Sequence, residues 1–313
     1  MNKKSFNLII SIIILLFLFE IFDHSNIIVK TIYSSTSIWF YNIVPTILPI
    51  YIIVDLLLNY NTIDYLSNIF GKFMEKVFKL KKETSFVFLL SIISGFPSNS
   101  KYLKNLLDDN VINTKEASKL LMFTHFSNPL FIIESIGINF LHNKKIGILI
   151  LIIHYLTNII IGFTNRNYYI NLDKNNNNKI KKNKISFINC FTNSIYNTIK
   201  ILFLLYGIIT IFMIITTVIK ENLNLNSTFS SLLCGLLEMT QGINYVSLLN
   251  IPINLKATII TFLISFGGFS IHMQVFSILS DYKLKYKDYF ISRIIHGTIA
   301  SSLVYLILNL GYN

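Results

Sequence analysis

The sequence predicts an all-α polytopic membrane protein that crosses the bilayer about seven times and carries two short re-entrant hairpins. Of its 313 residues, 53% are hydrophobic and 13% are charged, whereas a soluble domain carries about 25% charged residues. Several apolar runs reach the about 20 residues that a membrane-spanning helix needs. Other apolar stretches are interrupted by glycine, proline and small polar residues. Interrupted backbone is tolerated at membrane depth only where protein or a water-filled cavity covers it, so the interruptions indicate a site.

Charge and motif content exclude several classes of function. The net charge of +12 is compatible with nucleic-acid binding, but in a membrane protein an excess of lysine typically marks cytoplasmic loops. We therefore expect the lipid bilayer, and no nucleic acid, as a partner. Cys190 and Cys234 lack disulfide or metal-binding spacing, and the sequence has no His-Glu-x-x-His, P-loop or Gly-x-Ser-x-Gly motif. The sequence thus predicts neither an enzyme nor a metal or cofactor site.

The first predicted span covers Phe6 to Phe22 and begins just after Lys3 and Lys4. It resembles a signal peptide, but Glu20 to His24 stand where a small-residue cleavage site would be. We interpret residues 1–30 as an uncleaved N-terminal transmembrane helix whose start lies in the cytoplasm.

A re-entrant hairpin is predicted at residues 86–107. Apolar residues from Phe86 onward run into Gly95, Pro97, small polar residues and Lys101. Each arm has about 11 residues and reaches about 16 Å, which is half of the hydrocarbon thickness. The segment is therefore expected to enter the membrane, reverse near the midplane and leave on the same side.

Three full spans and this hairpin form a first repeat, which covers residues 31–165. The spans are placed at residues 39–58, 117–140 and 146–163, and an amphipathic connector of residues 59–84 precedes the hairpin. The middle span is interrupted at Ser127-Asn128-Pro129, because a proline nitrogen cannot donate the hydrogen bond that a helix needs.

The same order of elements recurs in residues 191–313, after an Asn/Lys-rich linker of residues 166–190 that we expect to be disordered. The second repeat contains, in order, a span at 194–219, a hairpin at 229–249, a span at 257–279 interrupted at Gly267 and Gly268, and a span at 289–310. Each repeat has an odd number of full spans, so the second copy must be inverted in the membrane. Inverted repeats with broken helices are found in many secondary transporters.

The distribution of basic residues supports this topology. With the N-terminus inside and both hairpins re-entrant, the inside segments hold 20 of the 27 Lys and Arg residues, and the outside loops hold five. If the first hairpin crossed the membrane fully, the linker of residues 166–190 would lie outside, against the positive-inside rule. If only the second hairpin crossed, Lys283, Lys285 and Lys287 would lie outside.

The interruptions expose helix N-termini near the midplane, where unpaired N–H groups and the helix dipole favour an anionic substrate group. The alternative role of the small polar residues is to satisfy freed backbone groups and to pack helices closely. Ionisable residues inside spans are costly and indicate function by default. We predict a substrate site shaped by Gly95, Pro97, Asn99, Asn128, Pro129, Gly267 and Gly268, with polar contacts from Ser98, Ser127, Ser270, Glu238, His272, Gln274 and Arg293.

Other polar residues leave their roles open at this point. Arg293 could extend to the lipid headgroups instead of contacting substrate. His154 and Asn158 share a helix face, and we expect them to form a structural hydrogen bond between helices. Lys101 could meet an anion or reach the membrane interface.

Four motifs lie in order along roughly residues 35–310. The first half contains Ser94-Gly95-Phe96-Pro97-Ser98-Asn99-Ser100-Lys101 and Phe126-Ser127-Asn128-Pro129-Leu130-Phe131-Ile132. The second half contains Gly235-Leu236-Leu237-Glu238 with Gly242, and Gly268-Phe269-Ser270-Ile271-His272-Met273-Gln274-Val275 followed by Arg293-Ile294-Ile295-His296-Gly297. Together the motifs resemble the YlbJ/SpoVV family of sporulation integral membrane proteins. The chain departs from that pattern at Phe96 and Asn99, where the family leads us to expect tyrosine and glycine.

The resemblance implies the Gate domain shared with nucleoside transporters, which use two re-entrant hairpins and two broken helices. It also implies a role in endospore formation, in which a family member moves dipicolinate out of the mother cell across the outer forespore membrane. Dipicolinate is a flat ring with two carboxylates, and two opposed helix N-termini could each bind one. We therefore expect a transporter of a small anionic solute, with a nucleoside or nucleobase transporter and a non-transporting membrane scaffold as the alternatives.

Overall fold

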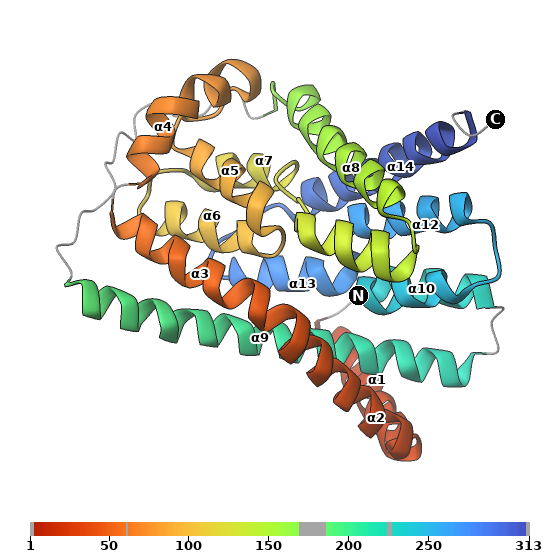
Figure 1. Ribbon diagram of the computed structural model, residues 1–313. Coiled ribbons are helices and arrows are strands. Elements are labelled where there is room, and N and C mark those ends of the chain that lie inside the picture. The colour runs from red at the N-terminus through yellow and green to blue at the C-terminus, as the bar shows by residue number, and fades with distance from the viewer. Residues whose placement is uncertain (1–2, 61, 169–185, 224–226, 311–313) are drawn as a thin grey trace.

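The computed structural model describes residues 3–60, 62–168, 186–223 and 227–310, and all regular secondary structure within them is helical. The first half contains α1 (Lys3–Asp23), α2 (Ser25–Ile38), the π-helix η1 (Trp39–Ile43), α3 (Val44–Asn59), α4 (Thr62–Phe73), η2 (Met74–Phe78), α5 (Thr84–Ser94), α6 (Ser98–Asp108), α7 (Thr114–Leu121), η3 (Phe131–Phe140) and α8 (Lys144–Thr164) (Figure 1). The second half contains α9 (Phe187–Asn222), α10 (Ser227–Leu237), α11 (Met239–Leu248), α12 (Ile253–Phe266), α13 (Gly268–Ile278) and α14 (Tyr286–Leu310).

Helix length and composition confirm a polytopic membrane protein. Among the described residues, five helical segments are long and apolar enough to cross a membrane, and a sixth is formed if the bent pair α2–η1 and α3 counts as one span. The five are Ser5–Asp23, Lys144–Thr164, Phe187–Asn222, Ile253–Ile278 and Tyr286–Leu310. The predicted span of residues 117–140 is not among them, because its helical parts are the eight-residue α7 and the ten-residue η3. The interruption is therefore wider than predicted and begins at Met122 instead of Ser127.

Two segments beside the hairpins are longer than their predicted counterparts. The second predicted span is part of a longer helical segment that bends by 47° between Ile43 and Ile47. Helix α9 begins seven residues before its predicted start, where the Ser186 hydroxyl accepts a hydrogen bond from the Asn189 N–H (3.4 Å). Most of the predicted linker, residues 169–185, lies outside the described residues. The connector is amphipathic as predicted, because it buries residues at helical spacing, namely Ile63, Ser67, Gly71, Met74 and Phe78.

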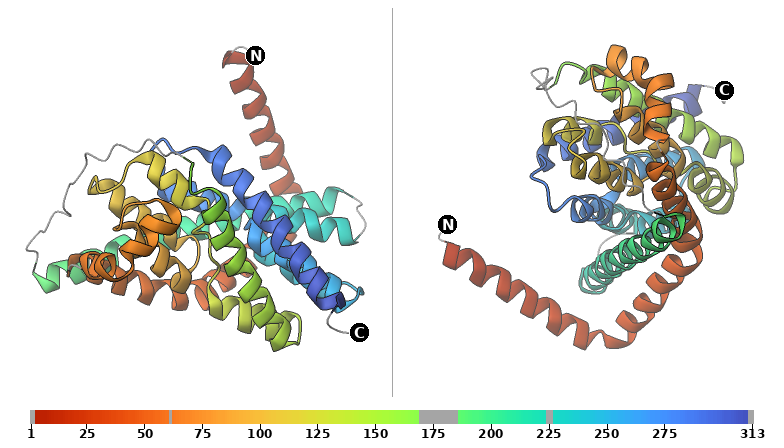
Figure 2. Two further views of the ribbon diagram at one scale, coloured as in Figure 1. Left: turned by 90° about the horizontal axis from the view of Figure 1, so that it is seen from above. Right: turned by 90° about the vertical axis from the view of Figure 1, so that its left-hand side faces the viewer.

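The long helix α9 extends along the molecule, and α2 and α3 pack across it (Figure 1). Hydroxyl pairs join the two layers, including Thr31–Thr217 (3.0 Å) and Ser35–Thr210 (2.9 Å). Small polar residues of this kind hold helices together in membranes, where no hydrophobic driving force acts between them. Helix α1 projects away from the rest of the molecule, and its apolar side chains are almost all exposed (Figure 2). That exposure suits a helix that faces lipid.

Hairpin one consists of α5 and α6, joined at Gly95-Phe96-Pro97. The chain reverses there, because the rings of Phe86 and Tyr102 lie 6.0 Å apart although 16 residues separate them in the sequence. Gly95 has a φ of +75°, and a Cβ at this position would lie 2.5 Å from the backbone nitrogen of Asn128. A glycine is therefore required for the tip to approach the interruption after α7. Phe96 packs against two clusters of buried apolar side chains, one that includes Phe86 and one that includes Ile132.

Hairpin two consists of α10 and α11, with Glu238 alone between them. A Cβ on Gly242 would lie 2.0 Å from the Cα of Gly235, so the two arms touch through their backbones. The predicted hairpin of residues 229–249 thus matches two described helices within about two residues at each end, which is the ordinary uncertainty of helix boundaries.

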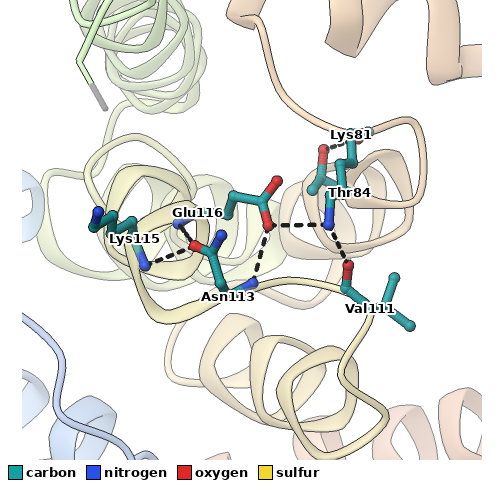
Figure 3. Close-up of polar contacts among 6 residues, drawn as sticks. All are labelled: Lys81, Thr84, Val111, Asn113, Lys115 and Glu116. Atoms are coloured by element: carbon teal, nitrogen blue, oxygen red, sulfur yellow. Dashed lines mark hydrogen bonds and ion pairs between the residues drawn. The ribbon is translucent and has the colours of Figure 1, made fainter. Parts of the chain in front are cut away.

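A capping box fastens the start of α7 to the start of α5 (Figure 3). The Asn113 side chain accepts hydrogen bonds from the backbone N–H groups of Lys115 (3.0 Å) and Glu116 (2.9 Å). The Glu116 carboxylate accepts one in return from the N–H of Asn113 (2.9 Å). Lys81, just before α5, lies 3.4 Å from this carboxylate and donates to the Val111 carbonyl (2.9 Å). One polar cluster therefore fixes the outer ends of hairpin one and of the interrupted segment.

We expect Asn113→Ala to lower the free energy of unfolding by about 1 kcal/mol, because alanine leaves the two N–H donors at the start of α7 without acceptors. The midpoint of thermal unfolding in detergent measures this change. Asn113→Ser is the control, since a serine hydroxyl can still cap the helix. Equal midpoints for the alanine variant and the unmodified protein would show that the cap does not contribute.

Candidate functional site

A cavity of about 320 Å³ lies where the two hairpins and both interrupted segments meet. Such a volume is within the range of small-molecule sites. Hairpin one contributes Phe96 and Pro97, and hairpin two contributes Glu238, Met239 and Thr240. The rest of the lining comes from Ser94, from Ser127, Asn128, Leu130, Phe131, Glu134 and Ser135, from Ile271 and Gln274, from Leu205 and Ile209, and from Ile38, Tyr41, Asn42, Ile43 and Ile47.

Five of the predicted site residues line this cavity: Pro97, Ser127, Asn128, Glu238 and Gln274. The structure places the others in the layer behind the lining or in a separate polar network, and these are Gly95, Ser98, Asn99, Pro129, Gly267, Gly268, Ser270, His272 and Arg293. The sequence analysis missed Tyr41 and Asn42. These two residues precede Pro45 and Pro49 in the second span, and the two prolines are the sequence signal that could have found them, because the helix bends there.

Three helices begin at the cavity: α6 after Pro97, η3 after Leu130 and α11 after Glu238. Their N-termini direct partial positive charge into it. Two of these ends already hold an acceptor from the chain itself. The Glu238 carboxylate accepts from the N–H of Gln241 (2.7 Å), and the Asn128 side chain accepts from the N–H of Leu130 (2.8 Å).

The charged residues of the lining are acidic. Glu134 and Glu238 contribute carboxyl groups, and among the residues that the structure describes no lysine or arginine lines the cavity. Glu238 is 2% exposed, so its carboxyl group is held inside protein and not at a solvated surface. Gln274 contributes an amide whose nitrogen donates to the Ser270 hydroxyl (3.2 Å). The cavity therefore combines helix N-termini, amide and hydroxyl groups with two carboxyl groups.

Behind the cavity, side chains satisfy the backbone carbonyls that the interruption after α7 leaves free. Arg293 donates to the carbonyl of Met122, and the Asn99 amide donates to that of Thr124 (3.2 Å). The Asn158 amide donates to the carbonyl of His125 (2.8 Å). The N–H of Phe96, at the tip of hairpin one, donates to the carbonyl of Phe126 (2.7 Å). Non-helical backbone inside a membrane protein needs partners of this kind.

Helix α8 satisfies both backbone groups of Ser127. The His154 Nε2 atom accepts from the Ser127 N–H (3.0 Å), and the Tyr155 hydroxyl donates to the Ser127 carbonyl (2.9 Å). Because Nε2 accepts, the imidazole is neutral with its proton on Nδ1, which donates to the Ser265 hydroxyl (2.9 Å). His154 thus links the interruption of the first repeat to the end of α12. The expected inter-helix role of His154 and Asn158 agrees with these contacts.

Arg293 lies at the centre of this network and is fully buried, so it does not extend to the lipid headgroups. Its guanidinium donates to the side-chain oxygen of Asn158 (3.3 Å) and to the Nδ1 atom of His296 (2.9 Å). Within the described residues, no carboxylate forms an ion pair with it. Its contacts connect α14 to α8 and to the interrupted segment.

The two glycines at the second interruption permit close backbone contact. A Cβ on Gly267, whose φ is +91°, would lie 2.7 Å from the His125 ring. A Cβ on Gly268 would lie 3.0 Å from the Met239 nitrogen at the tip of hairpin two. The start of α13 is thereby held against the first interrupted segment and the tip of hairpin two. His272 is not among the residues that line the cavity, and it contacts the carbonyl of Phe266 through Nε2 (2.9 Å).

The fold and the cavity together define a class: an all-helical polytopic membrane protein in which two helical hairpins and two interrupted segments line a shared cavity. Residues 40–144, which include hairpin one and the first interruption, match the Gate family model, described as nucleoside recognition. The chain is 26% identical to the sporulation integral membrane protein YlbJ of Bacillus subtilis (strain 168), over 98% of this chain and 84% of that relative. These comparisons confirm the resemblance seen in the motifs. No solved structure matches the chain significantly.

Proposed function

We propose that the protein transports a small anionic metabolite during endospore formation, and that the substrate is dipicolinate, carried from the mother cell across the outer forespore membrane. The observation that supports transport most directly is the cavity itself, to which both hairpin tips and both interrupted segments contribute. Similarity to a sporulation membrane protein supports the setting. The N-terminus lies in the cytoplasm in this scheme, and no catalytic step or cofactor is involved.

The mechanism follows from the arrangement of the hairpins. If both are re-entrant and the two repeats are inverted, each hairpin closes the cavity from one side of the membrane. Rocking of one repeat against the other would then expose the cavity to each side in turn, as in other transporters with broken helices. The helix dipoles at the starts of α6 and η3 favour the carboxylates of the substrate close to these ends, beside the Asn128 amide that caps η3, and the amide and hydroxyl groups of the lining orient it.

A nucleoside or nucleobase is the second candidate substrate, because two features favour it. The lining contains Glu134 and Glu238 without a lysine or arginine, and the matched family model is described as nucleoside recognition. Carboxylates form strong hydrogen bonds to sugar hydroxyl and base N–H groups, whereas they repel an anion.

Glu238→Gln separates the two substrates, because its expected effects have opposite signs. Glutamine keeps an oxygen that can accept from the N–H of Gln241, so α11 remains capped. For dipicolinate, loss of the negative charge should lower KM for uptake about tenfold. For a nucleoside such as uridine, loss of a charge-assisted hydrogen bond should raise KM about tenfold. Saturation uptake of both labelled compounds into vesicles containing the purified protein measures these changes.

Glu221→Gln is the matched control, because Glu221 is exposed at the end of α9 and does not line the cavity. It should leave KM for either compound unchanged. Absence of saturable uptake of both compounds by the unmodified protein would contradict the transport proposal and favour the membrane scaffold.

A further inference from the structure

A second hollow, of about 430 Å³, lies between α3, α6, α9 and α13. Figure 1 shows α6 and part of α3 on the side of the molecule that carries α4, with α13 near the middle and α9 extending along the whole length. We call this hollow the vestibule. It is lined by Asp55, by Lys101, Lys104, Asn105 and Asp108, by Asn197, Lys200, Ile201 and Leu204, and by Ser277 and Ile278.

The vestibule and the cavity follow one another along the same helix faces. Ile47 lines the cavity and Asp55 lines the vestibule, eight residues further along α3. On α13, Gln274 lines the cavity and Ile278 the vestibule, and α9 shows the same four-residue spacing between Ile201 and Leu205. Residues four apart share a helix face and rise about 6 Å along the axis. About one to two helical turns therefore separate the residues that line the two spaces.

A buried ion pair lies between the two spaces. The Lys101 ammonium is 3.0 Å from the Asp55 carboxylate and 4.4 Å from the centre of the Tyr51 ring. Tyr51 lies on α3 midway between Ile47 and Asp55, and it is fully buried. The side chains of Lys101 and Asp55 are only 6% and 12% exposed. Charged groups inside a membrane protein are costly and usually mark a pathway for an ion or a substrate.

The mouth of the vestibule is more exposed than this ion pair, and its charges are unevenly paired. Lys104 forms an ion pair with Asp281, and the Asp108 carboxylate accepts from the Tyr282 hydroxyl. Lys200 is exposed, and it forms no ion pair within the part of the chain that the structure describes. An arriving anion would therefore meet the positive charge of Lys200 first and the ion pair of Lys101 last.

We infer that the vestibule is a second anion site, in which a carboxylate-bearing solute binds Lys101 in place of Asp55 before it passes Tyr51 into the cavity. This inference rests on the proposed function and adds the vestibule as the route by which the solute reaches the cavity. The solute's carboxylate then pairs with Lys101, while the displaced Asp55 carboxylate, which lines the vestibule, is hydrated by the water that fills this hollow. The amides of Asn105 and Asn197 supply donors for a second carboxylate.

Equilibrium binding of labelled dipicolinate to the purified protein tests the inference. The double variant Asp55→Asn/Lys101→Gln should raise the Kd about tenfold, because the charged donor is lost. The double variant avoids an uncompensated buried charge, which would unfold either single variant more readily. Lys200→Gln should slow dipicolinate uptake at low ionic strength and should have little effect at high ionic strength, where exposed charges are screened. An unchanged Kd in a folded double variant would overturn the inference.

A labelling experiment keeps the test decisive if the double variant does not fold. Cys190 and Cys234 are buried, so they are expected to react slowly with an anionic thiol reagent. In an Asn197→Cys variant, dipicolinate should slow the reaction of the new cysteine several-fold, whereas in Leu248→Cys, at the exposed end of hairpin two, it should not. If dipicolinate did not slow the labelling of an Asn197→Cys variant that still transports dipicolinate, the vestibule site would be refuted and the proposed function would not. Absence of both binding and transport in the unmodified protein would instead refute the proposed function.

Discussion

Gly242→Ala is expected to prevent hairpin two from closing, with a loss of about 3 kcal/mol or more in the free energy of unfolding. The added Cβ would lie 2.0 Å from the Cα and 2.4 Å from the nitrogen of Gly235. Both atoms belong to the backbone, so the arms of the hairpin must separate. Because Glu238 lies at the tip between these arms, its carboxyl group would leave the cavity as they part.

The chain offers a matched control for this prediction. Gly207 lies within α9, and a Cβ there would have no atom within 4 Å. Gly207→Ala should therefore keep stability or raise it by up to about 1 kcal/mol, because alanine favours helix more than glycine does. The unfolding midpoints in detergent and the dipicolinate uptake of the two variants measure the difference. Wild-type behaviour of Gly242→Ala would show that the arms do not meet as described.

Arg293→Met is expected to lower the free energy of unfolding by roughly 2–5 kcal/mol, because three buried acceptors lose their donor. These acceptors are the Met122 carbonyl, the Asn158 side-chain oxygen and the Nδ1 atom of His296. Methionine fills much of the volume, so the effect reports lost hydrogen bonds more than a cavity. The interruption after α7 would then lose one of its attachments to α14, and transport should fail together with stability.

One further substitution separates charge from geometry at this position, and a substitution of the other arginine is the control. Arg293→Lys keeps the positive charge but offers a compact ammonium in place of the planar fork, so an intermediate loss of stability is expected. Arg166→Met removes the other arginine of the chain, whose side chain contacts the Lys76 carbonyl near the surface (3.1 Å). It should change stability by less than about 0.5 kcal/mol. Equal losses for Arg166→Met and Arg293→Met would contradict a specific role for the buried network.

Much of the architecture could be predicted from local features of the sequence. The length of an apolar run and the absence of charge predict a membrane helix before any contact is known, as in Lys144–Thr164. Gly95 and Gly267 change the backbone through their own covalent structure, so the tip of hairpin one and the second interruption could be placed from single residues, whereas the first interruption begins at Met122, before the predicted Ser127. The membrane class, the order of the elements and the positions of the hairpins follow from such local rules.

The partners of the polar side chains could not be predicted in this way. The Asn99 amide contacts the Thr124 carbonyl, and Lys101 contacts Asp55, through the packing of helices that are distant in the sequence. The sequence analysis predicted Asn99 and Arg293 at a substrate site, and only the tertiary structure placed them behind it. Spacing along one helix shows which residues share a face, but it does not show what that face meets. The sequence by itself determined a membrane protein with interrupted helices, and the packing decided which polar groups support the interruptions and which ones line the cavity.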